Sequence, residues 1–289
     1  MLATYGDGDR AVRYVHQRLN TSVFADIDTL MDNVLRVTAH LAAQSGDTRR
    51  VLRLHPAADG RPYAQDAAGA PWRTLAFIDG ARTDRRFSGA SQAAEGARCA
   101  ARLVADLVGL QPPLPEVIPG FHDVVGRVGH LEAARDADPC GRGAGCQAEV
   151  DAVLGHAAVA IEVAVARADG RLPQRTVHND AKVENLLFDS ATGVALCLVD
   201  LDTVGPGTVL FDVGDLVRSG AACGPEDGGS EDGGSDTIAV DHDIVAAVLD
   251  GYAGAGAGFL TPAELDLLPL AGPLMALEAG ARFLSLIHI

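Results

Sequence analysis

Four polar residues are closely spaced in the segment 176–203, which reads TVHNDAKVENLLFDSATGVALCLVDLDT. Asp180 is followed by Lys182 and Asn185, and an apolar run further along the chain ends at Asp200. A carboxylate such as Asp180 can orient a hydroxyl group and accept its proton, and Lys182 can neutralise charge on a phosphate. Asn185 and Asp200 offer the hard oxygen ligands that Mg²⁺ prefers. These residue types are those that a phosphoryl-transfer centre requires.

A hairpin is the element that would bring these residues together. Two apolar runs, 186–189 and 194–202, flank a turn at Gly193 and predict two short strands. The hairpin would place Asn185, at its start, near Asp200, at its far end. A buried polar network at a loop crossing is the alternative, because an aspartate beside a histidine is often only a turn or cap residue. The order of the four roles around one hairpin favours catalysis.

The segment HNDAKVENLL, residues 178–187, resembles the catalytic loop of protein kinases, His-Arg-Asp-x-Lys-x-x-Asn, in every spacing. Small-molecule kinases related to aminoglycoside and choline phosphotransferases share this loop and carry Asp-x-Asp or Asp-x-Glu, as in Asp200-Leu201-Asp202. The resemblance spans residues 14–284 and is closest to the N-acetylhexosamine 1-kinase branch of that superfamily. The segments that carry it are RYVHQRLN (13–20), LPEVIPGFHDVVGRVGHL (114–131), VDLDTVGPGTVLFDVGDLVR (199–218) and EAGARFL (278–284).

The resemblance implies a reaction that uses ATP and Mg²⁺. Asp180 would be the catalytic base, and Lys182 would help to neutralise the transferred phosphate. Asn185 and Asp200 would hold the magnesium ion. The family pattern therefore gives these four residues the same roles that their chemistry suggests.

Five further residues take supporting roles by the same resemblance. His178 begins the catalytic loop, and Asp202 would support the metal site from behind. Asp212 belongs to an Asp-x-Gly-Asp segment and would accept hydrogen bonds from the catalytic loop. Arg127 and Arg282 match positions near the acceptor, so they are the candidate substrate-binding residues.

The implied fold is a two-lobed α+β fold of the protein-kinase type. Residues 1–78 would form a partial, β-rich N-terminal lobe on the nucleotide side. Residues 79–289 would form a mainly helical C-terminal lobe with the catalytic loop and the acceptor site. Apolar periodicity predicts helices over 28–43, 91–108 and 147–168.

The nucleotide side departs from the family pattern. Residues 2–19 predict a β-hairpin, and the glycine-bearing nucleotide loop of the family precedes such a hairpin. The family also continues beyond Leu284, so we expect a chain that is truncated at both ends, with an unrelated terminus at 285–289. The small lobe has no lysine to bind the nucleotide phosphates. Arg13 or Arg18 could replace it, although arginine and lysine are not interchangeable.

Composition and net charge argue against several classes of protein. The chain has 289 residues, 48% of them hydrophobic, and a net charge of -16, which argues against nucleic acid and anionic membranes as partners. Residues 1–10 lack the apolar segment of a signal peptide, and no apolar run reaches the roughly 20 residues of a membrane span. Five cysteines without paired spacing are typical of reduced thiols. We expect a soluble cytoplasmic protein with an acidic surface loop over 224–236.

Together these features predict ATP- and magnesium-dependent phosphorylation of a sugar hydroxyl, with the anomeric hydroxyl of an N-acetylhexosamine as the expected acceptor. Choline, ethanolamine, homoserine or an aminoglycoside is the alternative acceptor, and an acidic pocket would favour a cationic one. A non-catalytic kinase-like fragment is the other alternative, because the glycine loop and the nucleotide lysine are missing.

Overall fold

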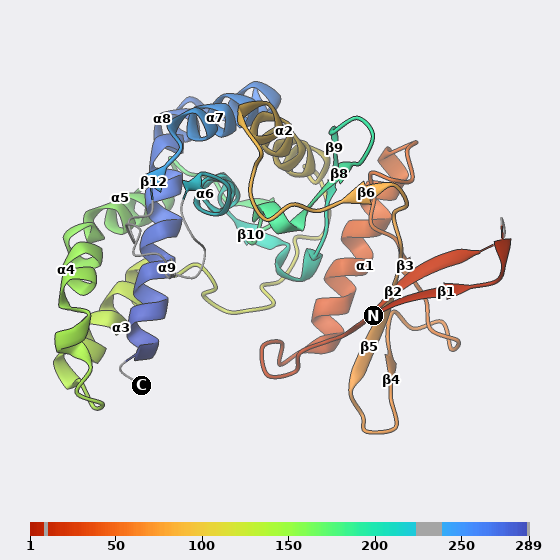
Figure 1. The fold of residues 1–289 in the computed structure, drawn as a ribbon, viewed down its shortest axis with the longest axis horizontal. Helices are drawn as coiled ribbons and strands as arrows, with labels where there is room; N and C mark the ends of the chain where they lie inside the picture. The colour runs from red at the N-terminus through yellow and green to blue at the C-terminus, as the bar shows by residue number, and fades with distance from the viewer. Residues whose placement is uncertain (9–10, 224–238, 288–289) are drawn as a thin grey trace, which may run out of the picture.

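Five short strands form an antiparallel sheet in the N-terminal part of the protein (Figure 1). The computed structural model describes residues 1–8, 11–223 and 239–287. The first hairpin pairs Leu2 with Val15 and confirms the hairpin predicted over 2–19, although residues 9 and 10 of its turn lie outside the described residues. The strands follow the order β1-β2-β5-β3, with β4 also paired to β5: β1 (Leu2–Tyr5), β2 (Val12–Arg18), β5 (Pro71–Ala76), β3 (Leu54–His55) and β4 (Ala64–Gln65).

One long helix, α1 (Ile27–Gln44), lies beside this sheet and confirms the helix predicted over 28–43. Asp26 begins it, because its carboxylate accepts a hydrogen bond from the N–H of Thr29 at 3.0 Å. The helix buries an apolar stripe that includes Leu30 and Val34. It also contacts the short 3₁₀ turn at 201–203, so it connects the sheet to the segment that follows Asp200.

The predicted catalytic hairpin is present. The strands β8 (Leu186–Asp189) and β9 (Ala195–Leu198) pair with Leu186 opposite Leu198, and β6 (Ala81–Arg82) extends this sheet to three strands. The second strand is shorter than predicted. It ends at Leu198 because Asp200 adopts a left-handed backbone conformation, with φ of 62°, which an extended strand cannot contain.

Helices make up most of the remaining chain and cover the catalytic hairpin (Figure 1). The helix predicted over 91–108 is confirmed as α2 (Ala90–Asp106), which packs against α7 (His242–Gly256). The helix α6 (Val209–Gly220) packs against α9 (Ala271–Ile287), and Gly214 allows a close approach because a Cβ there would meet the carbonyl of Ala271.

The prediction of a single helix over 147–168 is wrong in one respect, because the segment forms two helices. The chain forms α4 (Gln147–Gly155) and α5 (Ala157–Ala168), with a break at His156. The His156 imidazole nitrogen Nδ1 donates to the carbonyl of Ala152 at 2.7 Å, and Gly155 is a weak helix former. Apolar spacing continues across the break, so periodicity alone could not reveal it. Both helices lie near α3 (Val124–Ala137) (Figure 1).

The C-terminal helical region is also divided, into α8 (Pro262–Leu267) and α9, with a 3₁₀ turn between them. Within the described ranges, 262–286 is one helical stretch that is long and apolar enough to cross a bilayer. Half of its most apolar window is buried inside the protein, and this burial is typical of a core helix. The helix predicted over 262–283 is thus confirmed, although the sequence showed no unbroken apolar run here because polar residues interrupt it.

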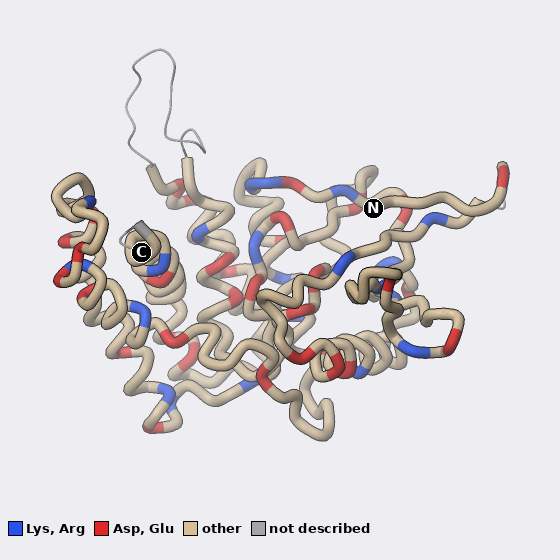
Figure 2. The backbone as a smooth tube through the Cα atoms, turned by 90° about the horizontal axis from the view of Figure 1, so that it is seen from below, with Lys and Arg blue, Asp and Glu red and all other residues tan. Residues whose placement is uncertain are grey.

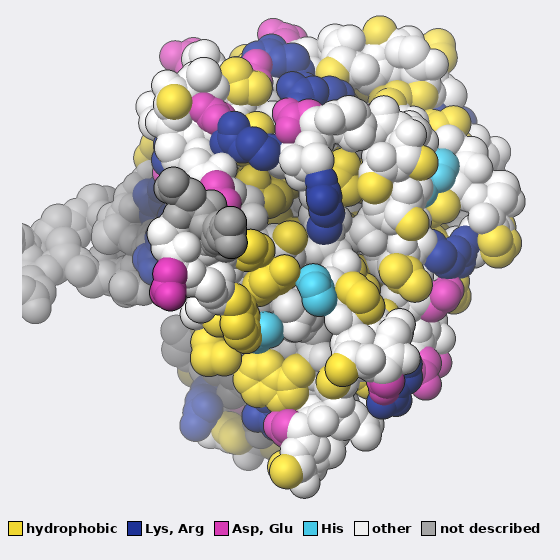
Figure 3. All heavy atoms as spheres, turned by 90° about the vertical axis from the view of Figure 1, so that its right-hand side faces the viewer, with side chains coloured by type: hydrophobic (Ala, Val, Ile, Leu, Met, Phe, Trp, Pro, Cys, Tyr) yellow, Lys and Arg dark blue, Asp and Glu magenta, His cyan; other side chains and the backbone are white. Residues whose placement is uncertain are grey.

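Charged residues are spread over the whole chain (Figure 2), in keeping with the net charge of -16. The acidic segment predicted as a surface loop over 224–236 lies outside the described residues. The side of the protein near β1 and β2 mixes histidine, hydrophobic and charged side chains (Figure 3). The rings of Tyr14 and His55 contact each other there, with centroids 5.0 Å apart. No single charge sign dominates this face.

Candidate active site

The catalytic loop begins where β7 (Arg175–Val177) ends, and its backbone is bound by α6. Asp212 lies in the first turn of α6 and is fully buried. Its two carboxylate oxygens accept hydrogen bonds from the N–H groups of His178 at 3.0 Å and Asn179 at 2.8 Å. Burial raises the pKa of Asp212, while His178 and the two N–H donors oppose that rise. One buried carboxyl group therefore holds the backbone of the catalytic loop through two hydrogen bonds.

His178 joins the catalytic loop to the segment 199–203, which follows strand β9 of the catalytic hairpin. Its imidazole is fully buried, and Nε2 donates to the carbonyl of Val199 at 3.0 Å. The carbonyl of His178 itself accepts a hydrogen bond from the hydroxyl of Thr203 at 2.8 Å. These two contacts fix the loop relative to Asp200, which lies between Val199 and Thr203 in the chain. His178 thus acts on the position of the loop and has no exposed surface for a substrate.

Asp180 lies at the centre of a hydrogen-bonded group. Its Oδ2 accepts from the Lys182 ammonium at 2.9 Å and from the Asn185 amide nitrogen at 3.0 Å. The side chain of Asp180 is 26% exposed, so a hydroxyl group can reach it. Burial lowers the pKa of Lys182. The hydrogen bond to Asp180 and the charges of Asp180 and Asp200 raise it, and the net shift is upward. Lys182 is therefore a stable cation beside both carboxylates.

The predicted metal ligands lie next to each other at the end of the hairpin. The N–H of Val199 donates to the carbonyl of Asn185 at 2.8 Å, so Asn185 lies opposite the residue that precedes Asp200. The amide nitrogen of Asn185 is used by Asp180, which leaves its oxygen for a ligand. Asp200 is 44% exposed on its side chain and lies 3.9 Å from the nearest arginine, Arg73. An amide oxygen and an accessible carboxylate fit a magnesium ion.

Arg73 is a buried residue at the edge of the site that the sequence analysis did not select. It lies on β5, and its side chain is 3% exposed. Its Nε donates to Gln17 at 2.9 Å, and its guanidinium pairs with Asp202. Burial raises the pKa of Asp202, and Arg73 opposes this rise. The alternation along β5, which puts Arg73 on the same face as the buried Leu75, was the available signal, because a buried guanidinium requires an acidic partner.

A cavity of about 400 Å³ lies between the N-terminal sheet and the metal-side aspartates. Arg18 lines it together with Arg73 and Asp200. Arg13, the other candidate for the nucleotide phosphates, instead pairs with Asp79 and stacks 4.3 Å from the centroid of the Phe77 ring. Of the two candidate arginines, Arg18 is therefore the one that shares a cavity with Asp200.

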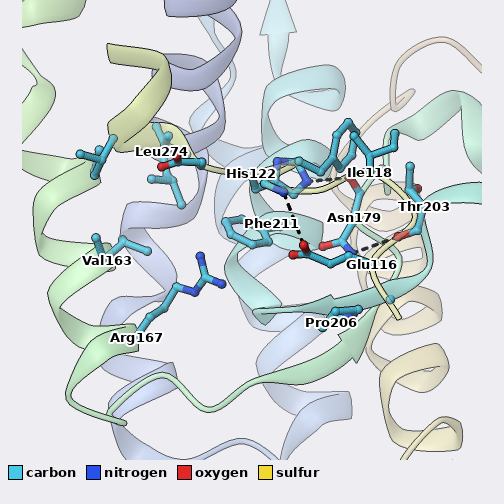
Figure 4. A pocket seen from close by; sticks show the side chains of 18 of the residues that line it. Glu116, Ile118, His122, Val163, Arg167, Asn179, Thr203, Pro206, Phe211 and Leu274 are labelled. Atoms are coloured by element: carbon cyan, nitrogen blue, oxygen red, sulfur yellow. Dashed lines mark hydrogen bonds between the residues drawn. The ribbon is translucent and has the colours of Figure 1, made fainter. Parts of the chain in front are cut away.

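A second cavity, of about 300 Å³, lies on the other side of the catalytic loop (Figure 4). Asn179, the residue directly before Asp180, lines it. Figure 4 shows His122, Arg167 and Phe211 around the same space, and the Arg167 guanidinium lies 5.5 Å from the centroid of the Phe211 ring. Near Asn179 only glycine fits at position 207, because a Cβ would meet the Asn179 amide oxygen. This cavity is mixed in charge, with Glu116 also in its lining.

The structure does not bring the two predicted substrate-binding arginines to the catalytic loop. Arg127, on α3, donates to Glu278 at 2.8 Å and to the carbonyl of Phe121 at 2.7 Å. Arg282, on α9, is exposed and stacks 5.1 Å from the centroid of the Phe283 ring. Neither is among the described residues that line the cavity of Figure 4. Arg167, which the sequence analysis did not select, lies there instead, together with His122, which belongs to the family-like segment 114–131.

Solved structures of small-molecule kinases share this fold. The amicoumacin kinase hAmiN, in complex with AMP-PNP, Ca²⁺ and Ami, is 16% identical, and the match covers 98% of this chain and 80% of that one, with a TM-score of 0.61. The microcompartment-associated aminopropanol kinase is 17% identical, with coverage of 96% and 86% and a TM-score of 0.53. Aminoglycoside phosphotransferase APH(3'')-Id from Streptomyces rimosus, in complex with ADP and streptomycin, is 14% identical, with coverage of 94% and 92% and a TM-score of 0.52. The predicted kinase-like α+β fold is confirmed.

A family model described as the phosphotransferase enzyme family, APH, matches residues 6–255. The matched region includes the catalytic loop, both aspartates of 200–202 and Asp212. It therefore contains the group of residues around Asp180 that the structure brings together. The chain belongs to the phosphotransferase enzyme family and is a small-molecule phosphotransferase.

Proposed function

We propose that this phosphotransferase transfers the terminal phosphoryl group of ATP to a hydroxyl group of a small acceptor, and that Asp180 orients that hydroxyl. The observation that carries the proposal is the shared contact at Asp180, whose carboxylate binds Lys182 at 2.9 Å and Asn185 at 3.0 Å. These contacts hold the carboxylate in one orientation, which is the main contribution a protein makes to phosphoryl transfer. Asp180 also receives the hydroxyl proton as the new phosphate ester forms.

Asn185 and Asp200 would hold a magnesium ion, which when bound neutralises charge on the phosphate oxygens. Lys182 adds positive charge on the same side, since its ammonium binds Asp180 and interacts electrostatically with Asp200. Arg18 lines the adjacent cavity and is the candidate for contact with the nucleotide phosphates, because the guanidinium of Arg73 in the same lining is already paired with Asp202. Two of the structural relatives were solved with AMP-PNP or ADP, which supports this choice of donor.

We propose the cavity of Figure 4 as the acceptor site and an N-acetylhexosamine, phosphorylated at its anomeric hydroxyl, as the acceptor. The volume of about 300 Å³ is sufficient for a monosaccharide. Arg167 can donate hydrogen bonds to sugar oxygens, and its charge would repel a quaternary ammonium group. Apolar side chains such as Val163 and Phe211 complete the lining, and they suit the apolar face of a sugar ring.

A panel of acceptors with ATP and Mg²⁺ tests this proposal. We expect turnover of N-acetylglucosamine or N-acetylgalactosamine, with an acid-labile sugar phosphate as the product detected by ³¹P NMR. Choline, ethanolamine and streptomycin should give little turnover. If the amines were phosphorylated and the sugars were not, the acceptor proposal would be wrong while the phosphotransferase assignment would stand.

An amino alcohol is the second candidate acceptor. Glu116 lines the same cavity, and its carboxylate makes only a 3.4 Å contact with the N–H of Gly120. An ammonium group could bind there, and one structural relative is an aminopropanol kinase. Replacing Glu116 by Gln separates the candidates, because it should weaken an amino alcohol acceptor and leave the KM of a neutral sugar nearly unchanged.

A further inference from the structure

A buried histidine outside the catalytic loop contacts that loop directly. His122 lies just before α3, and its side chain is 7% exposed. Its Nε2 donates to the carbonyl of Asn179 at 2.8 Å, and its Nδ1 donates to Glu278 of α9 at 2.7 Å. Its ring lies between the rings of Phe121 and Phe211, with centroid distances of 4.5 Å and 4.3 Å. The imidazole therefore has one defined orientation.

The two hydrogen bonds require a charged ring. A carbonyl and a carboxylate both accept hydrogen bonds, so both ring nitrogens must donate, and only the imidazolium has two N–H groups. Burial lowers the pKa of His122, but the bond and charge of Glu278, with smaller effects of Asn179 and Asp215, produce a net upward shift. Other charged groups near this ring are Asp123 at the start of α3, Arg127 on α3, Arg167 on α5 and Glu116 in the loop before α3.

His122 and Asp212 bind the same residue from two sides. The N–H of Asn179 donates to Asp212 at 2.8 Å, and its carbonyl accepts from His122 at 2.8 Å. That carbonyl belongs to the peptide group that joins Asn179 to Asp180. Asn179 has a φ of 63°, a left-handed conformation that an ordinary side chain rarely adopts without support. The two contacts supply that support directly before the proposed base.

We propose that His122 is a positioning residue, which holds the peptide group before Asp180 in place and makes α9, through Glu278, part of the active-site framework. This inference rests on the proposed function for its kinetic consequences. Its structural consequence, a catalytic loop that loosens without the imidazolium, is independent of that function. Glu278 acts through His122, and Arg127 in turn holds Glu278 at 2.8 Å.

The test compares His122→Phe, which keeps a ring between Phe121 and Phe211 but removes both donors, with His130→Phe on the exposed surface of α3 as the control. Hydrogen exchange of the peptide 176–186 should be faster in H122F and unchanged in H130F. The value of kcat should fall by about tenfold to 10²-fold in H122F, as expected for a misplaced catalytic group. Calorimetric binding of ATP with Mg²⁺ should change by less than about twofold, because the nucleotide cavity is lined by other residues.

A second variant tests the charge. In the wild-type protein kcat should decline at alkaline pH, where His122 loses its proton. In Glu278→Gln the imidazolium loses its anionic partner, so the pKa of His122 falls and this decline of kcat should move to lower pH. In H122F this decline should be absent. Unchanged exchange of 176–186 in a folded H122F protein would overturn the proposal, and so would an equal loss of nucleotide affinity and kcat. If the wild-type protein phosphorylated no acceptor, the proposed function would fail, while the exchange measurement would still decide the role of His122.

Discussion

The metal side and the acceptor side of the site are built in different ways. On the metal side, Asp180, Lys182, Asn185 and Asp200 come from one loop and one hairpin, and the register of β8 and β9 brings them together. On the acceptor side, the cavity is lined by segments that are far apart in the chain, from Glu116 to Leu274. The metal side is therefore fixed by local geometry, whereas the acceptor side depends on how the helices pack. This difference predicts that variants on the two sides will have separable effects.

The largest effect should come from a long-range ion pair on the metal side. Arg73→Met leaves the carboxylate of Asp202, 12% exposed, without its cation. Breaking a buried ion pair from one side costs about 3–5 kcal/mol of unfolding free energy, which urea denaturation can measure. The double variant Arg73→Met/Asp202→Leu should recover most of this loss, since it removes both charges.

Arg61→Met provides the matched control, because Arg61 pairs with Asp59 on the surface, where their side chains are 60% and 50% exposed. It should leave the free energy of unfolding close to the wild-type value, as is usual for exposed pairs. If Arg73→Met had the same free energy of unfolding as the wild-type protein, this arginine would not stabilise the contact between the N-terminal sheet and Asp202.

Next in size is the loss of the proposed base. Asp180→Ala should lower kcat by about 10²-fold or more, which is the low end of general base contributions. Asp250→Ala, an exposed carboxylate on α7, is the control and should keep the wild-type rate. Steady-state kinetics at saturating ATP would measure both. Near-normal turnover in Asp180→Ala would contradict the role of this carboxylate and leave the group at 180–185 as a structural network.

Asp200→Ala should act through the metal. Removing one of the two proposed protein ligands should raise the Mg²⁺ concentration needed for half-maximal turnover by at least about tenfold, comparable to or larger than the loss of an outer-shell partner. A magnesium titration of turnover measures it, with Asp250→Ala again as the control. An unchanged magnesium dependence would remove Asp200 from the ligand set.

The grouping of the four metal-side residues could be predicted from the sequence because short-range spacing determines it, whereas their roles stay predictions. The pattern from His178 to Asn185, and the hairpin that follows, leave little freedom in where Asp200 can lie. Arg73 was missed because its partner Asp202 lies 129 residues away in the chain, and no local pattern connects the two positions. The predicted kinase-like fold followed from the resemblance rather than from periodicity, which failed at the break between α4 and α5.

The acceptor side was harder to predict for the same reason. The resemblance selected Arg127 and Arg282, but Arg127 is bound to Glu278 and Arg282 is exposed at the end of α9. Which arginine lines a cavity depends on helix packing, since a guanidinium that forms an internal ion pair has fewer donors left for a substrate. Arg167 has no distinctive sequence context, so only the arrangement of α5 against Phe211 identifies it.

The smallest predicted effect belongs to Arg167. Arg167→Leu should raise the KM of the acceptor by about fivefold, equivalent to about 1 kcal/mol for one hydrogen bond at an exposed position. The KM of ATP should stay constant, because Arg167 lines the acceptor cavity and not the cavity beside Asp200. Arg171→Leu, just beyond α5 and paired with Asp169 at 2.9 Å, is the control and should change neither constant. A rise in the KM of ATP alone would show that the two sides of the site are not separate, because a residue of the packed helices would then be acting on the metal side.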